Sequence, residues 1–166
     1  MECVDILLSG SDKKYTADEK AEIARRKNEY FAKSLEEVND SVIMPGTIDR
    51  LKELREKGIK IGVGSNSRNA KTIIQKVKLE NYIDVITDGY DIKKSKPDPE
   101  VFLLTASRLG LKNDECIVVE DAVAGIEAAH AAGMKALGIG TRDRLTKAEK
   151  VVKNLSEITT EEMIKL

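Results

Sequence analysis

Several residue types are scarce in this chain of 166 residues, and each scarcity excludes a class of protein. Tryptophan is absent and aromatic residues make up 4%, so a surface that stacks nucleobases is not expected. The two cysteines have no CxxC spacing, which argues against a disulfide framework and favours a reducing cytoplasm. The 28 basic side chains are balanced by 29 acidic ones, so the basic excess of nucleic-acid and membrane surfaces is missing.

The sequence also lacks a signal-peptide pattern and any apolar run long enough to cross a membrane. What it has instead is typical of a globular protein, with 41% hydrophobic and 34% charged residues. Its length suits one sizeable core. We therefore expect a cytoplasmic protein that binds neither nucleic acid nor membrane.

The first part of the chain carries a helical pattern. Residues 1–8 are helix-compatible, and Thr16 with Glu19 three positions later is a capping box. This box predicts a long helix that ends near Val38. A polar break follows, and we predict a helical domain over residues 1–44 and a second domain over residues 45–166.

The second domain shows regular alternation of strand and helix patterns. Helices are predicted over 47–57, 69–78, 100–109 and 123–132, and strands over 59–64, 84–87, 116–119 and 135–140. Such alternation predicts an α/β fold, a doubly wound sheet of parallel strands. The tail is predicted as short helical pieces around Val151 and Val152, with Thr160 capping the last. Tyr82 and Tyr90 flank a strand and are expected to cover its ends.

Two adjacent carboxylates, Glu120 and Asp121, follow an apolar strand that the pattern predicts to be buried. Ligands of open α/β sheets bind at the carboxyl ends of the strands, and adjacent acids there need a cation to offset their repulsion. Mg²⁺ prefers one or two carboxylates together with water and phosphate oxygens. The pair therefore indicates a Mg²⁺ site, and the alternative is an ordinary acidic helix start with Asp121 as the N-cap.

Polar groups also follow other strand ends. Ser65 and Asn66 follow one strand, and Lys96 lies in a loop bounded by prolines. A hydroxyl backed by helix N-terminal amides, together with a fixed lysine, is typical of phosphate binding. With the acid pair these residues would form the electrostatic part of a phosphoryl-transfer site. Taken singly, Ser65 is most often a turn residue and Lys96 a solvated charge.

These residues, in this order, resemble a known family. Ser65, Lys96-Pro97 and the segment 120–125 resemble motifs two, three and four of the haloacid dehalogenase (HAD) superfamily. The segments 95–99 and 119–126, with Arg-Lys-Asn at 26–28, resemble its β-phosphoglucomutase branch. The resemblance implies a HAD-like Rossmannoid core with residues 1–44 as a partial helical cap.

The resemblance also implies roles for individual residues. Ser65 and Asn66 would hold the transferring phosphoryl group, and Lys96 would neutralise its oxygens. Glu120 and Asp121 would hold Mg²⁺. Lys27 and Asn28 of the cap would contact a sugar phosphate; the alternative for Lys27 is a solvated helix charge. The implied activity is Mg²⁺-dependent interconversion of β-glucose 1-phosphate and glucose 6-phosphate, and the alternative is a sugar-phosphate phosphatase.

One family feature is missing from the sequence. The first HAD motif is an apolar strand followed by Asp-x-Asp, whose first Asp is the nucleophile, and these residues hold no Asp-x-Asp. We expect the chain to begin within the cap, with Met1 an internal methionine of a longer protein. The chain would then be an inactive fragment or half of a split enzyme. Its sheet would have a gap between the strands that end at Ser65 and Asp121. The two facing edges would pair with each other, recruit a second molecule or aggregate.

A signalling receiver domain, which also uses an acid pair, a Ser or Thr and a Lys, is the remaining alternative. There the lysine comes last in the sequence, whereas Lys96 precedes the acid pair here.

Overall fold

The computed structural model describes residues 4, 8–11 and 13–166. It divides the chain into two compact units, Met1–Asn39 and Asp40–Leu166. Most of the helix that we expect over residues 1–8 lies outside the described residues. That the first unit is a partial cap stays a prediction.

The first unit is built on one long helix, α2 (Ala17–Glu37). Its start is the predicted capping box: Glu19 N donates to Thr16 Oγ1 at 3.2 Å, and Thr16 N donates to Glu19 Oε2 at 2.8 Å. Val38 is the C-cap, so the predicted helix is confirmed at both ends. The aromatic side chain of Tyr30 on this helix is 66% exposed.

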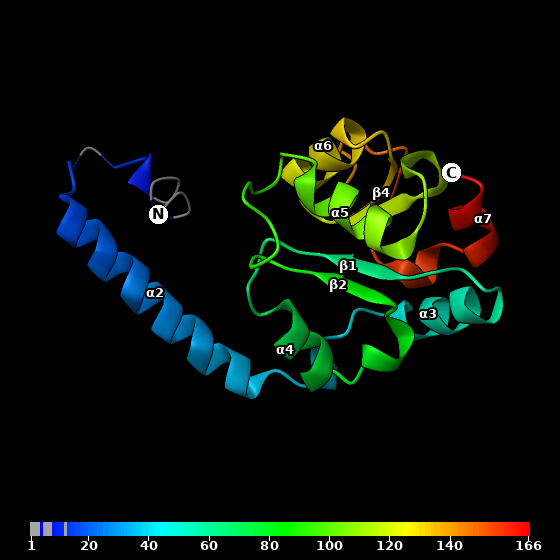
Figure 1. Ribbon diagram of the computed structural model, residues 1–166, viewed down its shortest axis with the longest axis horizontal. Helices are drawn as coiled ribbons and strands as arrows, with labels where there is room; N and C mark the ends of the chain where they lie inside the picture. Colours follow the sequence, from blue (N-terminus) through cyan, green and yellow to red (C-terminus); the bar gives the residue numbers. More distant parts are fainter. Residues whose placement is uncertain (1–3, 5–7, 12) are drawn as a thin grey trace. The chain divides into compact units, whose positions relative to one another are not determined.

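The second unit alternates helices and strands in the order predicted for most of its length (Figure 1). Its elements are α3 (Thr47–Glu56), β1 (Gly62–Gly64), α4 (Ala70–Lys76), β2 (Val85–Thr87), α5 (Glu100–Leu109), β3 (Ile117–Glu120), α6 (Val123–Ala131), β4 (Lys135–Ile139), β5 (Lys150–Val152) and α7 (Thr160–Ile164), with short 3-10 turns η1 (Asp40–Val42), η2 (Glu80–Tyr82), η3 (Asn113–Glu115) and η4 (Leu155–Glu157). Within the described part of the chain, no helix is long and apolar enough to span a membrane.

The strands form two separate parallel sheets. In one, β1 pairs with β2, with Gly64 opposite Thr87. In the other the order is β3-β4-β5, with Glu120 opposite Gly138. The described residues contain no pairing between β1 and β3. The α/β class with parallel strands is therefore confirmed. That a missing strand belongs between the strands that lead to Ser65 and Asp121 stays a prediction.

Helix α5 joins the two sheets through the core. It lies against β1 and β2, while its residues Val101, Phe102 and Ala106 pack in one buried cluster with Val118 of β3 and Ile126 of α6. The side chains of β4 alternate between two clusters, as the two-residue period of a strand requires. Ala136 belongs to the α5–α6 cluster, and Leu137 and Ile139 pack with residues from β5 to α7 on the other side. This second cluster consists of Leu137, Ile139, Val152, Leu155, Ile158 and Met163.

The tail departs from its prediction. Val151 and Val152 lie in strand β5, which pairs with β4 through Gly138 and Ile139, and not in a helical piece. The β-branched pair gains cross-strand packing against β4, and such tertiary pairing overrides a weak local pattern. The last helix is capped by Thr159, whose side chain accepts from Glu162 N, so Thr160 is its first residue and not its cap.

Gly46 has both a left-handed backbone conformation and a close backbone neighbour, whereas Gly58 has only the left-handed conformation. Comparing the two positions therefore separates the effect of conformation from the effect of close approach. Gly46 has φ +80°, and a Cβ there would lie 2.2 Å from the backbone N of Ser156; Gly58 has φ +72° but open space around it. We predict that Gly58→Ala costs about 1–2 kcal/mol, the strain of the left-handed conformation. Gly46→Ala should cost at least about 2 kcal/mol more, because α3 must move away from η4. Urea unfolding of both variants measures the free energy of unfolding. Equal decreases for the two variants would contradict the close approach of residue 46 to the backbone of Ser156.

Candidate active site

Three strand ends are brought together at one edge of the second unit. Strands β1, β2 and β3 end at Gly64, Thr87 and Glu120. Ser65 N donates to Thr87 O at 2.9 Å, which extends the pairing of β1 and β2 by one residue. The polar residues that follow these strands therefore share the carboxyl-terminal edge, where ligands of open α/β folds bind.

Lys96 crosses the break between the two sheets. Its Nζ donates to Gly64 O of β1 at 3.1 Å and to Glu120 Oε2 of β3 at 2.7 Å. The ammonium also lies 4.5 Å from the ring centroid of Phe102 on α5. The Lys96 and Glu120 side chains are 13% and 12% exposed, so this is a nearly buried ion pair and not a solvated loop charge.

Glu120 fits beside α6 because residue 125 has no side chain. A Cβ on Gly125 would lie 2.1 Å from Glu120 Cδ. The other carboxylate oxygen of Glu120, Oε1, accepts from Asp121 N at 3.3 Å. Both oxygens of Glu120 are therefore engaged by groups of the chain itself.

Asp121 is exposed and does not cap α6, whose N-cap is Ala122. The N-cap role that the alternative interpretation gives to Asp121 is therefore wrong. The contacts of the described residues include no hydrogen bond or ion pair to the Asp121 carboxylate, so it is available to a cation. Among those residues, however, no three His, Cys, Asp or Glu side chains gather as a metal-binding group. The donor set fits Mg²⁺ only where water and phosphate oxygens supply most of the ligands, as Mg²⁺ commonly allows.

The turn after β1 uses its hydroxyl groups internally. Ser67 N donates to Ser65 Oγ at 3.1 Å, and Asn69 N donates to Ser67 Oγ at 3.2 Å. Asn66 Oδ1 accepts from Lys96 N at 3.3 Å, which ties this turn to the lysine loop. The structure thus brings Ser65, Asn66, Lys96 and Glu120 together. Helix α4 after the turn has only 7 residues, so it adds little of the helix-dipole support that the sequence suggested.

The sequence analysis did not identify Arg68 as a candidate residue, and it expected Tyr90 to cover the end of a strand. The guanidinium carbon of Arg68 lies 5.1 Å from the ring centroid of Tyr90, and Tyr90 is 74% exposed. Tyr90 therefore does not cover the end of β2 as expected. Arg68 stands three residues after Ser65, so a count of charges close to the strand ends would have found it.

The acids after β2 are engaged by other groups. Asp88 is 2% exposed and its Oδ1 accepts from Tyr90 N at 2.9 Å, while Lys71 lies 3.8 Å from Oδ2. Asp91 pairs with Arg108 at 2.8 Å. The Arg108 guanidinium and the backbone N–H of Asp88 hold the pKa of the Asp91 carboxyl far below its usual range. These acids stabilise the turn and offer no free ligand.

Lys27 and Asn28 lie on α2 in the first unit, and both are exposed. Their neighbour Arg25 pairs with Glu22 at 2.6 Å and also with Glu29. The other candidate residues belong to the second unit, and the role of Lys27 and Asn28 in substrate binding stays a prediction.

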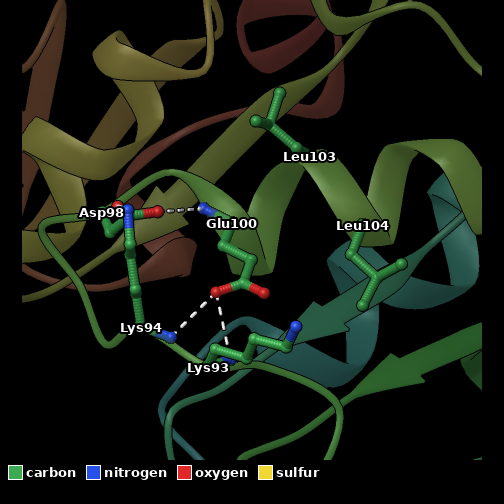
Figure 2. A pocket seen from close by; sticks show the side chains of 6 residues that line it. All are labelled: Lys93, Lys94, Asp98, Glu100, Leu103 and Leu104. Carbon is green, nitrogen blue, oxygen red and sulfur yellow. Dashed lines mark hydrogen bonds and ion pairs between the residues drawn. The ribbon is translucent and has the colours of Figure 1, made fainter.

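A surface depression lies beside the loop that carries Lys96 but is not the candidate site (Figure 2). It is lined by Lys93, Lys94, Asp98, Glu100, Leu103 and Leu104. The Glu100 carboxylate accepts from the backbone N of Lys93 and Lys94 at 3.0 and 2.8 Å, and the Lys94 side chain pairs with Asp98 at 3.3 Å. Its acids thus offset its two lysines, and the depression has no net charge for an anion.

Residues 6–139 match the model of a protein family described as haloacid dehalogenase-like hydrolase. The chain belongs to this family. The HAD resemblance seen in the sequence is thereby confirmed, and its β-phosphoglucomutase branch is supported by similar proteins. The chain is 35% identical over 156 residues to the beta-phosphoglucomutase of Bacillus subtilis, covering 94% of this chain and 69% of that one.

Two further HAD relatives bear on the fold and the branch. A solved β-phosphoglucomutase from Clostridium difficile has a TM-score of 0.88 and 34% identity, with 96% of this chain and 73% of that chain covered. The fructose-1-phosphate phosphatase YqaB of Escherichia coli is 40% identical over 79 residues, 48% of this chain and 42% of its own length. The chain thus spans about two thirds of one curated relative and less than half of another.

The Lys96–Glu120 pair should behave as a buried interaction. We predict that Lys96→Met destabilises the fold by about 3 kcal/mol, because it leaves the Glu120 carboxylate desolvated without a partner. The double variant Lys96→Met/Glu120→Gln should recover most of this loss. Denaturant unfolding of the single and double variants measures the coupling between the two side chains.

The matched control for this cycle is Lys94→Met, which removes a lysine from the same loop. Lys94 forms an ion pair with Asp98, but its side chain is 73% exposed. Such a pair should contribute no more than about 1 kcal/mol. If Lys94→Met and Lys96→Met lower the free energy of unfolding by similar amounts, the Lys96–Glu120 pair does not stabilise the fold more than an exposed pair does.

Proposed function

We propose that this chain is part of a HAD enzyme that transfers a phosphoryl group on a hexose phosphate with Mg²⁺, in the manner of β-phosphoglucomutase. The substrates would be β-glucose 1-phosphate and glucose 6-phosphate. The observation that carries the proposal is the Lys96–Glu120 pair, fixed at 2.7 Å beside Ser65 and Asn66 at the strand ends. Its support from similar proteins is the B. subtilis mutase, which aligns with 94% of the chain.

The charges at the site decide how a phosphate would be held. Lys96 already shares its charge with Glu120, so it offers directed N–H groups but little surplus positive charge. Arg68 has no carboxylate partner among the contacts of the described residues and supplies a positive charge close to Ser65. Bound at Asp121, Mg²⁺ would supply the remaining charge neutralisation for the phosphoryl oxygens.

The roles within this proposal follow the geometry. Lys96 contacts a phosphoryl oxygen through an N–H that is not used by Gly64 or Glu120. Ser65 and Asn66 hold the same group through the hydroxyl and the backbone N–H. The role of Lys27 and Asn28, which rests on the family resemblance and not on the geometry, is to contact the sugar phosphate.

The second candidate is a sugar-phosphate phosphatase of the same family. It is favoured by the E. coli relative YqaB, which is a fructose-1-phosphate phosphatase. The two activities use the same electrostatic site and differ in the acceptor, which is the sugar in a mutase and water in a phosphatase. The resemblance of residues 25–28 to the mutase branch favours the first candidate.

We further propose that the 166 residues by themselves are catalytically silent. They include no Asp-x-Asp, so the carboxylate nucleophile that this family uses is not among them. Among the described residues, no strand pairs with the edges of β1 and β3 that face each other, and Val119 on β3 is 41% exposed. Open strand edges beside apolar side chains favour association. We therefore propose that the chain recruits a strand from another molecule or aggregates.

The first test concerns metal binding. Asp121→Asn should abolish the weak binding of a divalent cation, because this carboxylate is the available ligand. Paramagnetic broadening of NMR signals by Mn²⁺ near residues 120–122 measures it. The control is Asp114→Asn, which removes an exposed acid from the turn before β3. Broadening that survives Asp121→Asn would remove Asp121 from the site.

The second test concerns activity. The purified chain should give no turnover of β-glucose 1-phosphate in an assay coupled to glucose-6-phosphate dehydrogenase with Mg²⁺ and a bisphosphate primer. Phosphate release from glucose 6-phosphate and fructose 1-phosphate is measured in parallel, to detect a phosphatase. A catalytic rate of about 1 per second or more, within the usual range for enzymes, would contradict the missing nucleophile.

A further inference from the structure

Tyr90 is an exposed aromatic residue with a specific partner. Its side chain is 74% exposed, and the guanidinium carbon of Arg68 lies 5.1 Å from its ring centroid, within the range of a cation–π contact. Arg68 comes from the turn after β1 and Tyr90 from the turn after β2. The contact therefore joins two turns at the edge that carries Ser65 and Lys96.

The backbone holds the two turns together independently of this contact. Gly89 N donates to Ser67 O at 3.2 Å. A Cβ on Gly89 would lie 2.4 Å from Asn66 O and 3.1 Å from Arg68 N, so the turns touch without an intervening side chain. The ring and the guanidinium thus start from backbones that are fixed relative to each other, which lowers the entropy lost when they stack.

The nearby carboxylates do not compete for Arg68. Asp91 is paired with Arg108 at 2.8 Å, and Asp88 is buried with its Oδ1 bonded to Tyr90 N. A carboxylate partner would cancel the charge of Arg68, whereas the neutral ring of Tyr90 restrains the guanidinium and leaves its charge available. Planar N–H groups beyond the ring can then bind an anion in a bidentate manner.

We propose that Tyr90 is a positioning residue: it holds Arg68 at the strand-end edge so that the guanidinium binds the anionic group of a phosphorylated substrate. The inference rests on the proposed function, since it assumes that this edge binds a sugar phosphate. It adds a residue from the turn after β2 to a site otherwise built from β1, β3 and the lysine loop.

The experiment measures the affinity of the 166-residue chain for glucose 6-phosphate by ³¹P NMR titration with Mg²⁺ present. Tyr90→Leu keeps an apolar side chain but removes the π face, and should weaken binding about two- to fivefold. Tyr90→Phe keeps the ring and should bind as the unsubstituted chain does. In an Arg68→Ala background, Tyr90→Leu should have no further effect, because the ring then has no cation to position.

The outcomes separate the two proposals. If Tyr90→Leu binds as tightly as the unsubstituted chain while Arg68→Ala and Lys96→Ala bind more weakly, the role of Tyr90 is overturned and the proposed function stands. If Tyr90→Leu weakens binding equally in the Arg68→Ala background, Tyr90 acts by itself and the inference is also overturned. No binding by the unsubstituted chain, or binding that none of these substitutions changes, would overturn the proposed function together with the inference. Melting temperatures verify that each variant folds: those of the Tyr90 and Arg68 variants should be equal because both side chains are exposed, whereas Lys96→Ala should melt at a lower temperature because it breaks the nearly buried pair with Glu120.

Discussion

The ion pair between Lys96 and Glu120 is the interaction on which the arrangement of the second unit depends. Two strands that do not hydrogen-bond to each other end on the same ammonium group, one through the Gly64 carbonyl and the other through the Glu120 carboxylate. A charge pair at this depth stabilises the fold only when its remaining hydrogen-bonding groups are satisfied. Here the Gly64 carbonyl and the Asp121 N–H meet part of that condition, the Phe102 ring lies 4.5 Å from the ammonium, and the third Lys96 N–H is the one proposed to contact a phosphoryl oxygen. Structure and candidate chemistry therefore rest on the same two side chains.

Helix α5 makes this arrangement possible despite the division of the sheet. It begins directly after the loop of Lys96, packs against β1 and β2, and shares a buried cluster with β3 and α6. The apolar contacts of one helix thus hold the two sheets together where backbone hydrogen bonds do not. Hydrophobic contact has no directional requirement, so it can span a break that a hydrogen-bonded ladder cannot.

Most of this organisation could be predicted from residues, because its signals are local. The capping box at Thr16, the glycine after Leu109 and the apolar run before Glu120 each act within a few positions of the chain. Strand β5 could not be found this way, since Val151 and Val152 become a strand only by pairing with β4.

The candidate site was predictable in part for the same reason. Residues directly after strands could be found by position. The carboxylate partner of Lys96 could not be derived by counting, because 24 positions separate the two side chains. The contact between Arg68 and Tyr90 also depends on how two turns pack, and the periodicity of the sequence does not predict such a contact.

The missing side chain at residue 125 has a consequence for how this site can vary. The space that a Cβ would take there is occupied by the Glu120 carboxylate, with Glu120 Cδ only 2.1 Å away from the Cβ position. Glu120 Cγ would also lie 2.2 Å from that Cβ, so a larger residue at 125 requires the side chain at 120 to move or to be replaced, and either change alters its distance from Lys96. Positions 96, 120 and 125 therefore form one steric and electrostatic unit, in which a change at any member limits what the other two can be.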